Sequence, residues 1–95
     1  LVNNAGTNLR RRPEEVSDED WDAVMDINLN SLMRLTRAAH PLLKASGRGR
    51  VINVASIMAI FALPFSPAYC ASKGAVVQYT KVLAVAWAGD GITAN

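Results

Sequence analysis

The stretch Arg50-Val51-Ile52-Asn53-Val54-Ala55-Ser56 decides the fold, because its length and its β-branched residues predict a buried strand. Leu1-Val2 has the character of the end of an earlier strand, and Ile92 begins a later one. Helical patterns occupy the two intervals between these strands. The order strand, helix, strand, helix, strand predicts an α/β fold built on a parallel sheet with right-handed crossovers.

The helix expected before the central strand begins near Ser17 and extends to about Ser46. Ser17 can cap it, and acidic residues follow in the first turn, at the positive end of the helix dipole. Asn28 and Pro41 interrupt the pattern, because Asn is a poor helix former and Pro must bend or locally break the hydrogen-bond ladder. Apolar residues recur at helical spacing, namely Trp21, Val24, Met25, Leu29, Leu32, Met33 and Leu35.

The helix expected after the central strand runs from about Pro67 to Ala88. Pro67 suits the first helical position, and Gly89-Asp90-Gly91 ends the helix. Between Gly74 and Ala88 its single charged residue is Lys81, so it is apolar on nearly all sides. Such a helix must be covered on more than one side. The sheet covers one side, and a second subunit is the expected cover for the other.

The composition limits the possible partners without naming one. The chain has 95 residues, of which 51% are hydrophobic, so it can form one small globular domain at most. The net charge is +2, and the run Arg10-Arg11-Arg12 is interpreted as a solvated loop and not as a nucleic-acid interface. We expect no membrane span, no signal peptide and no metal site. The single Cys70 cannot form an internal disulfide, which favours a reducing, cytoplasmic setting.

Tyr69 and Lys73 share a face of the second predicted helix, because they are four residues apart. A nearby ammonium favours the phenolate form of tyrosine, which makes the pair a suitable proton donor and acceptor for an alcohol or a carbonyl. Taken alone, such a pair is more often structural than catalytic.

Ser56 ends the central predicted strand, thirteen residues before Tyr69. In open α/β sheets the ligand crevice lies outside the carboxyl ends of the strands, and a hydroxyl there can polarise a carbonyl. Asn3-Asn4-Ala5-Gly6 follows the first strand at the same edge, where small residues let a flat ligand approach the backbone. Each segment also has a plain interpretation as the turn that follows a strand.

In this order the motifs resemble those of the short-chain dehydrogenase/reductase family: Asn3-Asn4-Ala5-Gly6, Asp26-Ile27-Asn28-Leu29, Ser56, and Tyr69-Cys70-Ala71-Ser72-Lys73. The resemblance covers essentially the whole chain. Within the family the chain is most similar to bacterial 3-oxoacyl-carrier-protein reductases and to sugar or gluconate dehydrogenases. The resemblance implies a Rossmann-type, doubly wound parallel sheet. It also implies hydride transfer between the nicotinamide of NAD or NADP and a small-molecule carbonyl or secondary alcohol.

The resemblance implies four catalytic residues. Tyr69 would be the general acid in carbonyl reduction and the base in alcohol oxidation, and Lys73 would stabilise its phenolate form. Ser56 would hold and polarise the substrate oxygen. Asn28 would interrupt its helix and hold a water that links Lys73 to solvent.

The resemblance also implies a set of cofactor contacts. Asn4 would touch the cofactor, while Ala5 and Gly6 would line its adenosine side. Tyr69 and Lys73 would complete the site from the helix, with Lys73 hydrogen-bonded to the nicotinamide ribose. The two long helices would pair with their copies in a homo-oligomer, a dimer or a tetramer.

Both ends of the chain fall within apparent strands, and the glycine-rich pyrophosphate loop and the substrate-covering region of the family are not among the 95 residues. We therefore expect residues 1–95 to be an internal fragment, the central to C-terminal catalytic portion of one dinucleotide-binding domain. Two alternatives stay open: a non-catalytic dinucleotide-binding member, and a truncated piece that is inactive on its own. The presence of all four implied catalytic residues favours the enzyme.

Overall fold

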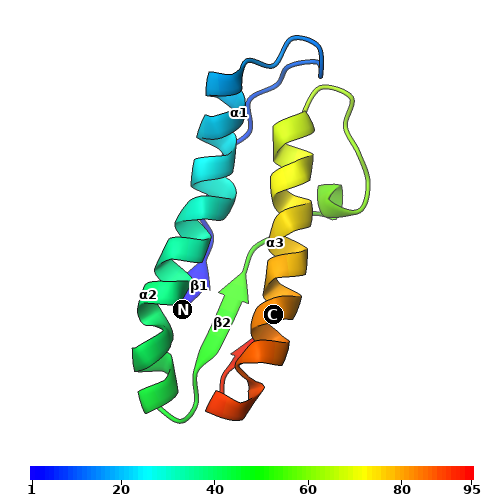
Figure 1. The fold of residues 1–95 in the computed structure, drawn as a ribbon. Helices are drawn as coiled ribbons and strands as arrows, with labels where there is room; N and C mark the ends of the chain where they lie inside the picture. The colour runs from blue at the N-terminus through cyan, green and yellow to red at the C-terminus, as the bar shows by residue number, and fades with distance from the viewer.

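Three short parallel strands form the sheet in the computed structural model, which describes all of residues 1–95. β1 is Val2–Asn3, β2 is Arg50–Asn53 and β3 is Thr93–Ala94, in the spatial order β1-β2-β3 (Figure 1). The predicted α/β fold with a parallel sheet is confirmed. The register places Val2 beside Ile52, Asn3 beside Asn53, Arg50 beside Thr93 and Val51 beside Ala94.

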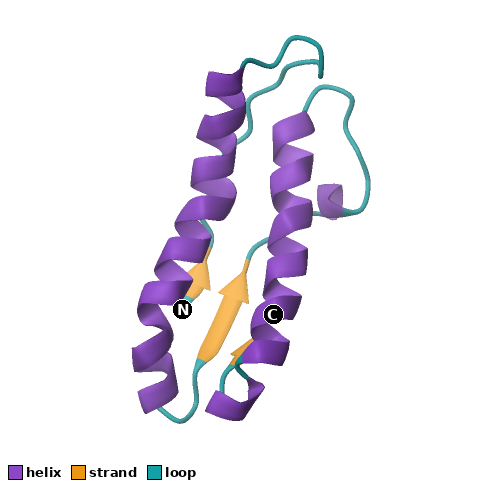
Figure 2. Ribbon diagram, viewed as in Figure 1, coloured by secondary structure: helices purple, strands orange, loops and turns teal.

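Two long helical segments cover one face of this sheet (Figures 1 and 2). The first runs without a gap through α1 (Asp18–Met25), a π-helical turn η1 (Asp26–Asn30) and α2 (Ser31–Ala45). The second is α3 (Pro67–Ala86). Each segment returns the chain from the end of one strand to the start of the next parallel strand, and the two segments lie side by side.

The core between the sheet and the helices is small. Val51 is fully buried, whereas the next residue, Ile52, is 49% exposed, because successive strand residues point to opposite faces. Val2 shares the exposed face with Ile52, and no element of these 95 residues covers that face. The buried cluster on the covered face consists of Val51, Leu83, Ile92 and Ala94.

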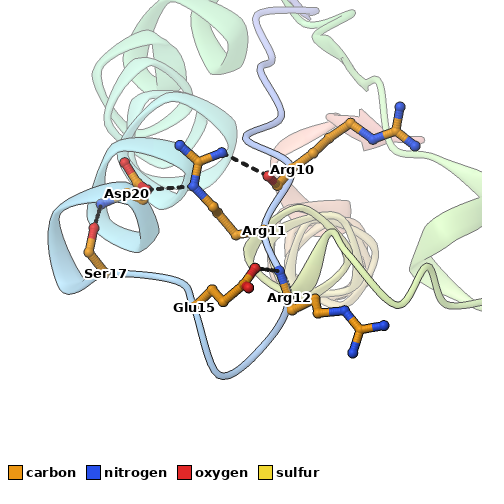
Figure 3. Close-up of polar contacts among 6 residues, drawn as sticks. All are labelled: Arg10, Arg11, Arg12, Glu15, Ser17 and Asp20. Atoms are coloured by element: carbon orange, nitrogen blue, oxygen red, sulfur yellow. Dashed lines mark hydrogen bonds and ion pairs between the residues drawn. The ribbon is translucent and has the colours of Figure 1, made fainter.

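The start of α1 carries the predicted cap. The hydroxyl of Ser17 accepts a hydrogen bond of 3.0 Å from the backbone N–H of Asp20 (Figure 3). Asp18, Glu19 and Asp20 occupy the first turn, where the helix dipole favours negative charge. No group of three or more His, Cys, Asp or Glu side chains is placed to hold a metal ion.

Asn28 marks the irregularity in the first helical segment. It lies inside η1, where the N–H of Ser31 donates to the carbonyl of Asp26, five residues earlier. One extra residue is therefore inserted into the helical turn. The interruption predicted at Asn28 is confirmed, while α2 continues through Pro41 to its end.

Two elements were predicted to extend further than they do in the structure. β2 ends at Asn53 and does not continue to Ala55, because β1, its neighbour, ends at Asn3. The N–H of Val54 makes the last bond to this neighbour, donating to the carbonyl of Asn3 at 3.0 Å. α3 ends two residues before the predicted Ala88.

Short 3-10 turns follow β2 and α3. They are η2 (Ile57–Ala59), in a segment predicted as plain loop, and η3 (Ala88–Asp90). Gly91 follows η3 with φ at 72°, a conformation that favours glycine, and it ends the helical segment as predicted.

A charged cluster joins the end of α2 to η3, at the edge of the sheet where β2 and β3 begin. His40 Nε2 lies 2.9 Å from Asp90 Oδ2, and Lys44 Nζ lies 2.8 Å from Asp90 Oδ1. The ring of His40 also stacks on Trp87, with centroids 4.4 Å apart. Hydrogen bonds from Lys44 and His40 lower the pKa of the Asp90 carboxyl below its ordinary value.

Both long helical segments expose apolar side chains, interspersed with charged ones such as Arg34, Arg37 and Lys81. A groove of about 500 Å³ lies between them, lined in part by Met33, Tyr79 and Val82. None of the helices combines the length and the apolar character needed to cross a bilayer. The most exposed apolar side chains on these helices are Leu35, Leu42, Val82 and Val85.

Candidate active site

An open cavity of about 530 Å³ lies beyond the carboxyl ends of β1 and β2, where ligands bind in open α/β sheets. Ser56, Tyr69 and Lys73, which the sequence predicted as one site, all line it. The segments that follow β1 and β2 form much of the wall, and α3 supplies the rest. The complete lining is Asn4, Gly6, Thr7, Asn8, Val54, Ala55, Ser56, Met58, Leu63, Tyr69 and Lys73.

Lys73 is the charged residue of this wall. Its side chain is buried, and its Nζ donates a hydrogen bond of 2.8 Å to the carbonyl of Val54, just after β2. Tyr69 lies one helical turn earlier on α3 and is half-buried, with its ring centroid 5.8 Å from Lys73 Nζ. The bond to Val54 fixes the ammonium beside the aromatic ring, at the inner end of the cavity.

Ser56 lines the cavity from the segment that follows β2. It caps η2, where its Oγ accepts a hydrogen bond of 3.1 Å from the N–H of Met58. The backbone thus occupies a lone pair of the hydroxyl and leaves its proton available to donate. A fixed hydroxyl donor on the cavity wall is suited to hold an oxygen atom of a ligand.

Asn28 lies behind the wall and does not line the cavity. Its Oδ1 accepts from the N–H of Thr7 at 2.7 Å, and its Nδ2 donates to the carbonyl of Thr7 at 2.9 Å. The same Nδ2 donates to Ser72 Oγ at 3.0 Å, and Ser72 Oγ donates to the carbonyl of Tyr69 at 2.8 Å. We call these side chains and the three backbone groups that they bind the amide network. It ties the segment after β1 to the start of α3.

The sequence did not predict Ser72 as a site residue, although Ser72 lies within the motif Tyr69-Cys70-Ala71-Ser72-Lys73. It is fully buried in α3, whose composition is largely apolar. A buried hydroxyl in an apolar helix requires a partner, and that requirement was the available signal.

A second buried polar contact was also missed. Asn3 Nδ2 donates to Asn53 Oδ1 at 2.8 Å and to Thr36 Oγ1 at 2.9 Å. Asn53 Nδ2 donates to Thr80 Oγ1 at 2.9 Å. These side chains form a continuous chain of bonds from α2 through β1 and β2 to α3. Asn3 and Asn53, called the asparagine pair below, fix the two strand ends from which the cavity wall departs.

Of the five residues expected to contact a cofactor, the three that follow β1 do not all line the cavity. Asn4 and Gly6 line it, whereas Ala5 lines a separate hollow of about 90 Å³ beside α2. A side chain at Gly6 would stand 3.5 Å from Lys73 Nζ and 3.7 Å from Asn28 Oδ1. Glycine therefore keeps open the space beside the buried ammonium. A flat ring with a hydroxylated sugar fits such an open, amide-lined and cationic space.

Comparison with known proteins connects these features. The model of the short chain dehydrogenase family matches residues 1–95. The chain is 43% identical over 95 residues to a tropinone reductase homolog of Arabidopsis thaliana, of which it covers 36%. It is also 43% identical over 95 residues to the 2-dehydro-3-deoxy-D-gluconate 5-dehydrogenase of Bacillus subtilis, of which it covers 37%. In both comparisons the whole of this chain is matched.

Solved structures agree with the sequence relatives. A gluconate 5-dehydrogenase from Burkholderia cenocepacia in complex with NADP and tartrate superimposes with a TM-score of 0.97 at 38% identity, over all of this chain and 37% of its own. A 4-hydroxyisoleucine dehydrogenase complexed with NADH gives a TM-score of 0.94 at 31% identity, over all of this chain and 42% of its own. The chain thus spans little more than a third of the length of the curated relatives it matches.

Proposed function

The chain belongs to the short-chain dehydrogenase family, and we propose that it carries the catalytic centre of an NAD- or NADP-dependent oxidoreductase. The sheet is accordingly part of a Rossmann-type fold. The proposed reaction is hydride transfer between the nicotinamide and a small-molecule carbonyl or secondary alcohol. The observation that carries the proposal is the meeting of Ser56, Tyr69 and Lys73 at one cavity beyond the strand ends.

The cofactor would occupy the side of the cavity formed by the segment after β1. Asn4 and Gly6 line that side, and Lys73 Nζ stands next to the space that Gly6 leaves open. The nicotinamide, when bound, donates or accepts the hydride. Lys73 has ammonium protons beyond the one bound to Val54, and these are available for a ribose hydroxyl.

Tyr69 would transfer the proton of the reaction. As a phenol it donates a proton to the carbonyl oxygen during reduction, and as a phenolate it accepts the hydroxyl proton during oxidation. Lys73 places a buried positive charge 5.8 Å from the centroid of the Tyr69 ring, on the same helix face and in the same cavity. Ser56 would hold the substrate oxygen through its available hydroxyl proton.

Asn28 would act at one remove from the reacting atoms. Its side chain is fully engaged with Thr7 and Ser72, so any contact with a water would come from its backbone, at the π-helical turn. The proposed water that links Lys73 to solvent fits this position, because the extra residue of η1 disturbs the local hydrogen-bond ladder.

Replacing Tyr69 with Phe tests the proposal directly. In the full-length protein we expect Tyr69→Phe to reduce turnover by about a hundredfold or more, since general acid–base catalysis has that magnitude. Binding of NADH or NADPH, followed by fluorescence, should persist. Retained turnover would exclude Tyr69 as the proton donor. Cofactor binding with no oxidoreductase activity in the wild type would instead favour a non-catalytic dinucleotide-binding protein.

The activity of residues 1–95 alone is a separate question. Because the chain spans little more than a third of its relatives, we expect the isolated chain to bind no dinucleotide and to be inactive. Titration of the purified 95-residue chain with NADH and NADPH checks this expectation. Binding at micromolar cofactor would contradict it.

The assembled protein would be a homo-oligomer, a dimer or a tetramer that pairs α2 and α3 with their copies. The supporting observations are the apolar groove between the helices and the exposure of Val85, at 82%, and of Leu42, at 76%. Light scattering of the full-length protein measures the state directly, and a monomer would contradict the proposal. The proposed location is the cytoplasm, in keeping with a single cysteine and a soluble cofactor.

A further inference from the structure

The cavity wall carries a positive charge and no negative charge. Among the lining residues Lys73 is charged, and none is an Asp or a Glu. The ammonium of Lys73 is held by the Val54 carbonyl, and the other polar lining groups, such as Asn8 and Ser56, are neutral. A positively charged cleft without carboxylates attracts an anionic ligand.

The basic run Arg10-Arg11-Arg12, which follows the lining residues Thr7 and Asn8 in the sequence, contains two kinds of arginine. Arg11 pairs with Asp20 at 3.7 Å, and Arg12 pairs with Glu14 at 3.6 Å. Arg10 has no acidic partner, and its guanidinium lies over the ring of Phe65, 4.2 Å from the centroid. Figure 3 shows Arg10 directed away from the pair formed by Arg11 and Asp20. All three arginines lie in an exposed loop, as predicted, and Arg10 differs from the other two by its contact with Phe65.

The loop that carries Arg10 is fixed to the cavity wall. The N–H of Arg11 donates to the carbonyl of Phe65 at 2.9 Å, and Asn8 Nδ2 donates to Ser66 Oγ at 3.1 Å. Asn8 and Leu63 both line the cavity. Arg10 is two residues from Asn8, and Phe65 is two residues from Leu63, so the stacked pair lies on the two segments that supply these lining residues.

Stacking leaves the guanidinium able to bind an anion. The contact with the ring, 4.2 Å from Cζ to the centroid, uses none of the N–H donors of the guanidinium, and these form the fork that matches a carboxylate. We propose that Arg10 binds a carboxylate of the substrate, which makes the substrate a hydroxy acid or the corresponding keto acid. This inference rests on the proposed oxidoreductase function, because it assigns the substrate side of the same cavity.

A binding experiment on the cofactor-loaded, full-length protein tests the inference with sodium tartrate as the anionic probe. Threitol, which has the same four-carbon skeleton without charge, is the neutral counterpart. The variants are Arg10→Gln and Arg10→Lys, and Arg12→Gln is the matched control from the same run. Calorimetry gives the dissociation constants of both probes and of the cofactor.

We expect wild-type protein and Arg12→Gln to bind tartrate more tightly than threitol. Arg10→Gln should weaken tartrate binding by about tenfold or more, the effect of a lost charged hydrogen bond, and leave threitol and cofactor binding unchanged. Arg10→Lys should give an intermediate value. Equal tartrate binding by Arg10→Gln and wild type, or no preference for tartrate over threitol, would overturn the inference.

A turnover measurement separates this inference from the proposed function. The same variants are assayed with D-gluconate and 3-hydroxybutanoate, and with sorbitol and methyl 3-hydroxybutanoate as neutral counterparts. A rise in KM for the acids alone in Arg10→Gln supports the inference. Wild-type turnover of the neutral compounds alone would overturn it and leave the oxidoreductase function standing. Arg10-dependent tartrate binding with no turnover of any compound would instead count against the oxidoreductase function.

Discussion

The two ends of the sheet are held together by different kinds of polar contact. Beyond the carboxyl ends of the strands, the amide network and the asparagine pair are buried, and apart from backbone groups they consist of neutral amides and hydroxyls. At the amino ends of β2 and β3, the cluster around Asp90 is charged and partly exposed. Neutral buried contacts do not titrate, so they hold the site in one geometry at any working pH. The charged cluster joins two elements far from the cavity and responds to acid.

The largest effect should come from the centre of the amide network. We expect Asn28→Ala to lower the free energy of unfolding by about 3 kcal/mol, because it leaves the N–H and carbonyl of Thr7 without partners in a partly buried place. Turnover should fall by about tenfold or more, since misplaced catalytic groups are costly. Urea denaturation and steady-state kinetics measure the two effects.

Asn30→Ala is the matched control for that variant. Asn30 lies two residues away in the same π-helical turn, and its side chain bonds the exposed carboxylate of Asp26. A surface contact of this kind is worth under about 0.5 kcal/mol. Equal losses in Asn28→Ala and Asn30→Ala would show that the amide network contributes no more to stability than a surface contact does.

Ser72→Ala should give the second largest effect. The substitution removes the hydrogen bond from Asn28 and the hydrogen bond to the Tyr69 carbonyl, while alanine is compatible with the helix. We therefore expect the free energy of unfolding to fall by about 1 to 2 kcal/mol. If Ser72 positions Tyr69, kcat falls and the cofactor Kd stays unchanged. Ser46→Ala is the control, because Ser46 makes an exposed bond within its own turn at the other end of the molecule. An unchanged kcat in Ser72→Ala would assign Ser72 a role in stability alone.

Gly91→Ala should lower the free energy of unfolding by about 1 kcal/mol, because φ at 72° is unfavourable for a residue with a side chain. Gly89→Ala is its control, since a side chain at Gly89 meets no atom within 4 Å and its φ is not positive. Thermal unfolding compares the two. Turnover should be normal in both, because this end of the sheet does not form the cavity. A loss of kcat in Gly91→Ala would contradict the separation of the two ends.

Asp90→Asn should give the smallest loss of stability, and the only loss that changes with pH. The pKa of Asp90 is lowered in the folded state by Lys44 and His40, so its stabilising effect is complete above the ordinary carboxyl pKa of about 4. That effect is lost as the pH falls through the lower, folded value. The difference in urea midpoint between wild type and Asp90→Asn should therefore shrink from pH 5 to pH 3. A difference that is constant over this range would contradict the prediction.

Local patterns predicted the elements and the cavity residues. Ser17 and Gly91 predicted helix boundaries because capping and positive φ are properties of single residues and their immediate neighbours. Tyr69 and Lys73 were placed on one face by their spacing alone. The interruption at Asn28 was visible because an amide in an apolar helix is unusual.

The contacts that the sequence did not predict join residues far apart in the chain. Asn3 and Asn53 are 50 residues apart, and Asn28 and Ser72 are 44 apart. The partner of each residue lies in a distant segment, so the local pattern around the residue does not identify that partner. The end of β2 at Asn53 was equally hidden, because it depends on the length of the neighbouring strand. The distinct role of Arg10 likewise depended on where Phe65, 55 residues later, meets the loop.

The asparagine pair also has a consequence for the order in which the chain folds. β1 cannot find its partner until some fifty later residues have been synthesised, and such distant pairing is slow compared with helix formation. A strand that paired one residue out of register would send its amide to the open face and bring Ile52 or Val2 inward in its place. The amide would then lose its hydrogen bonds to the other asparagine and to Thr36 or Thr80. A sheet that is one residue out of register is therefore less stable than the native sheet. The asparagine pair thus favours the correct alignment of β1 and β2 late in folding, before any ligand can bind.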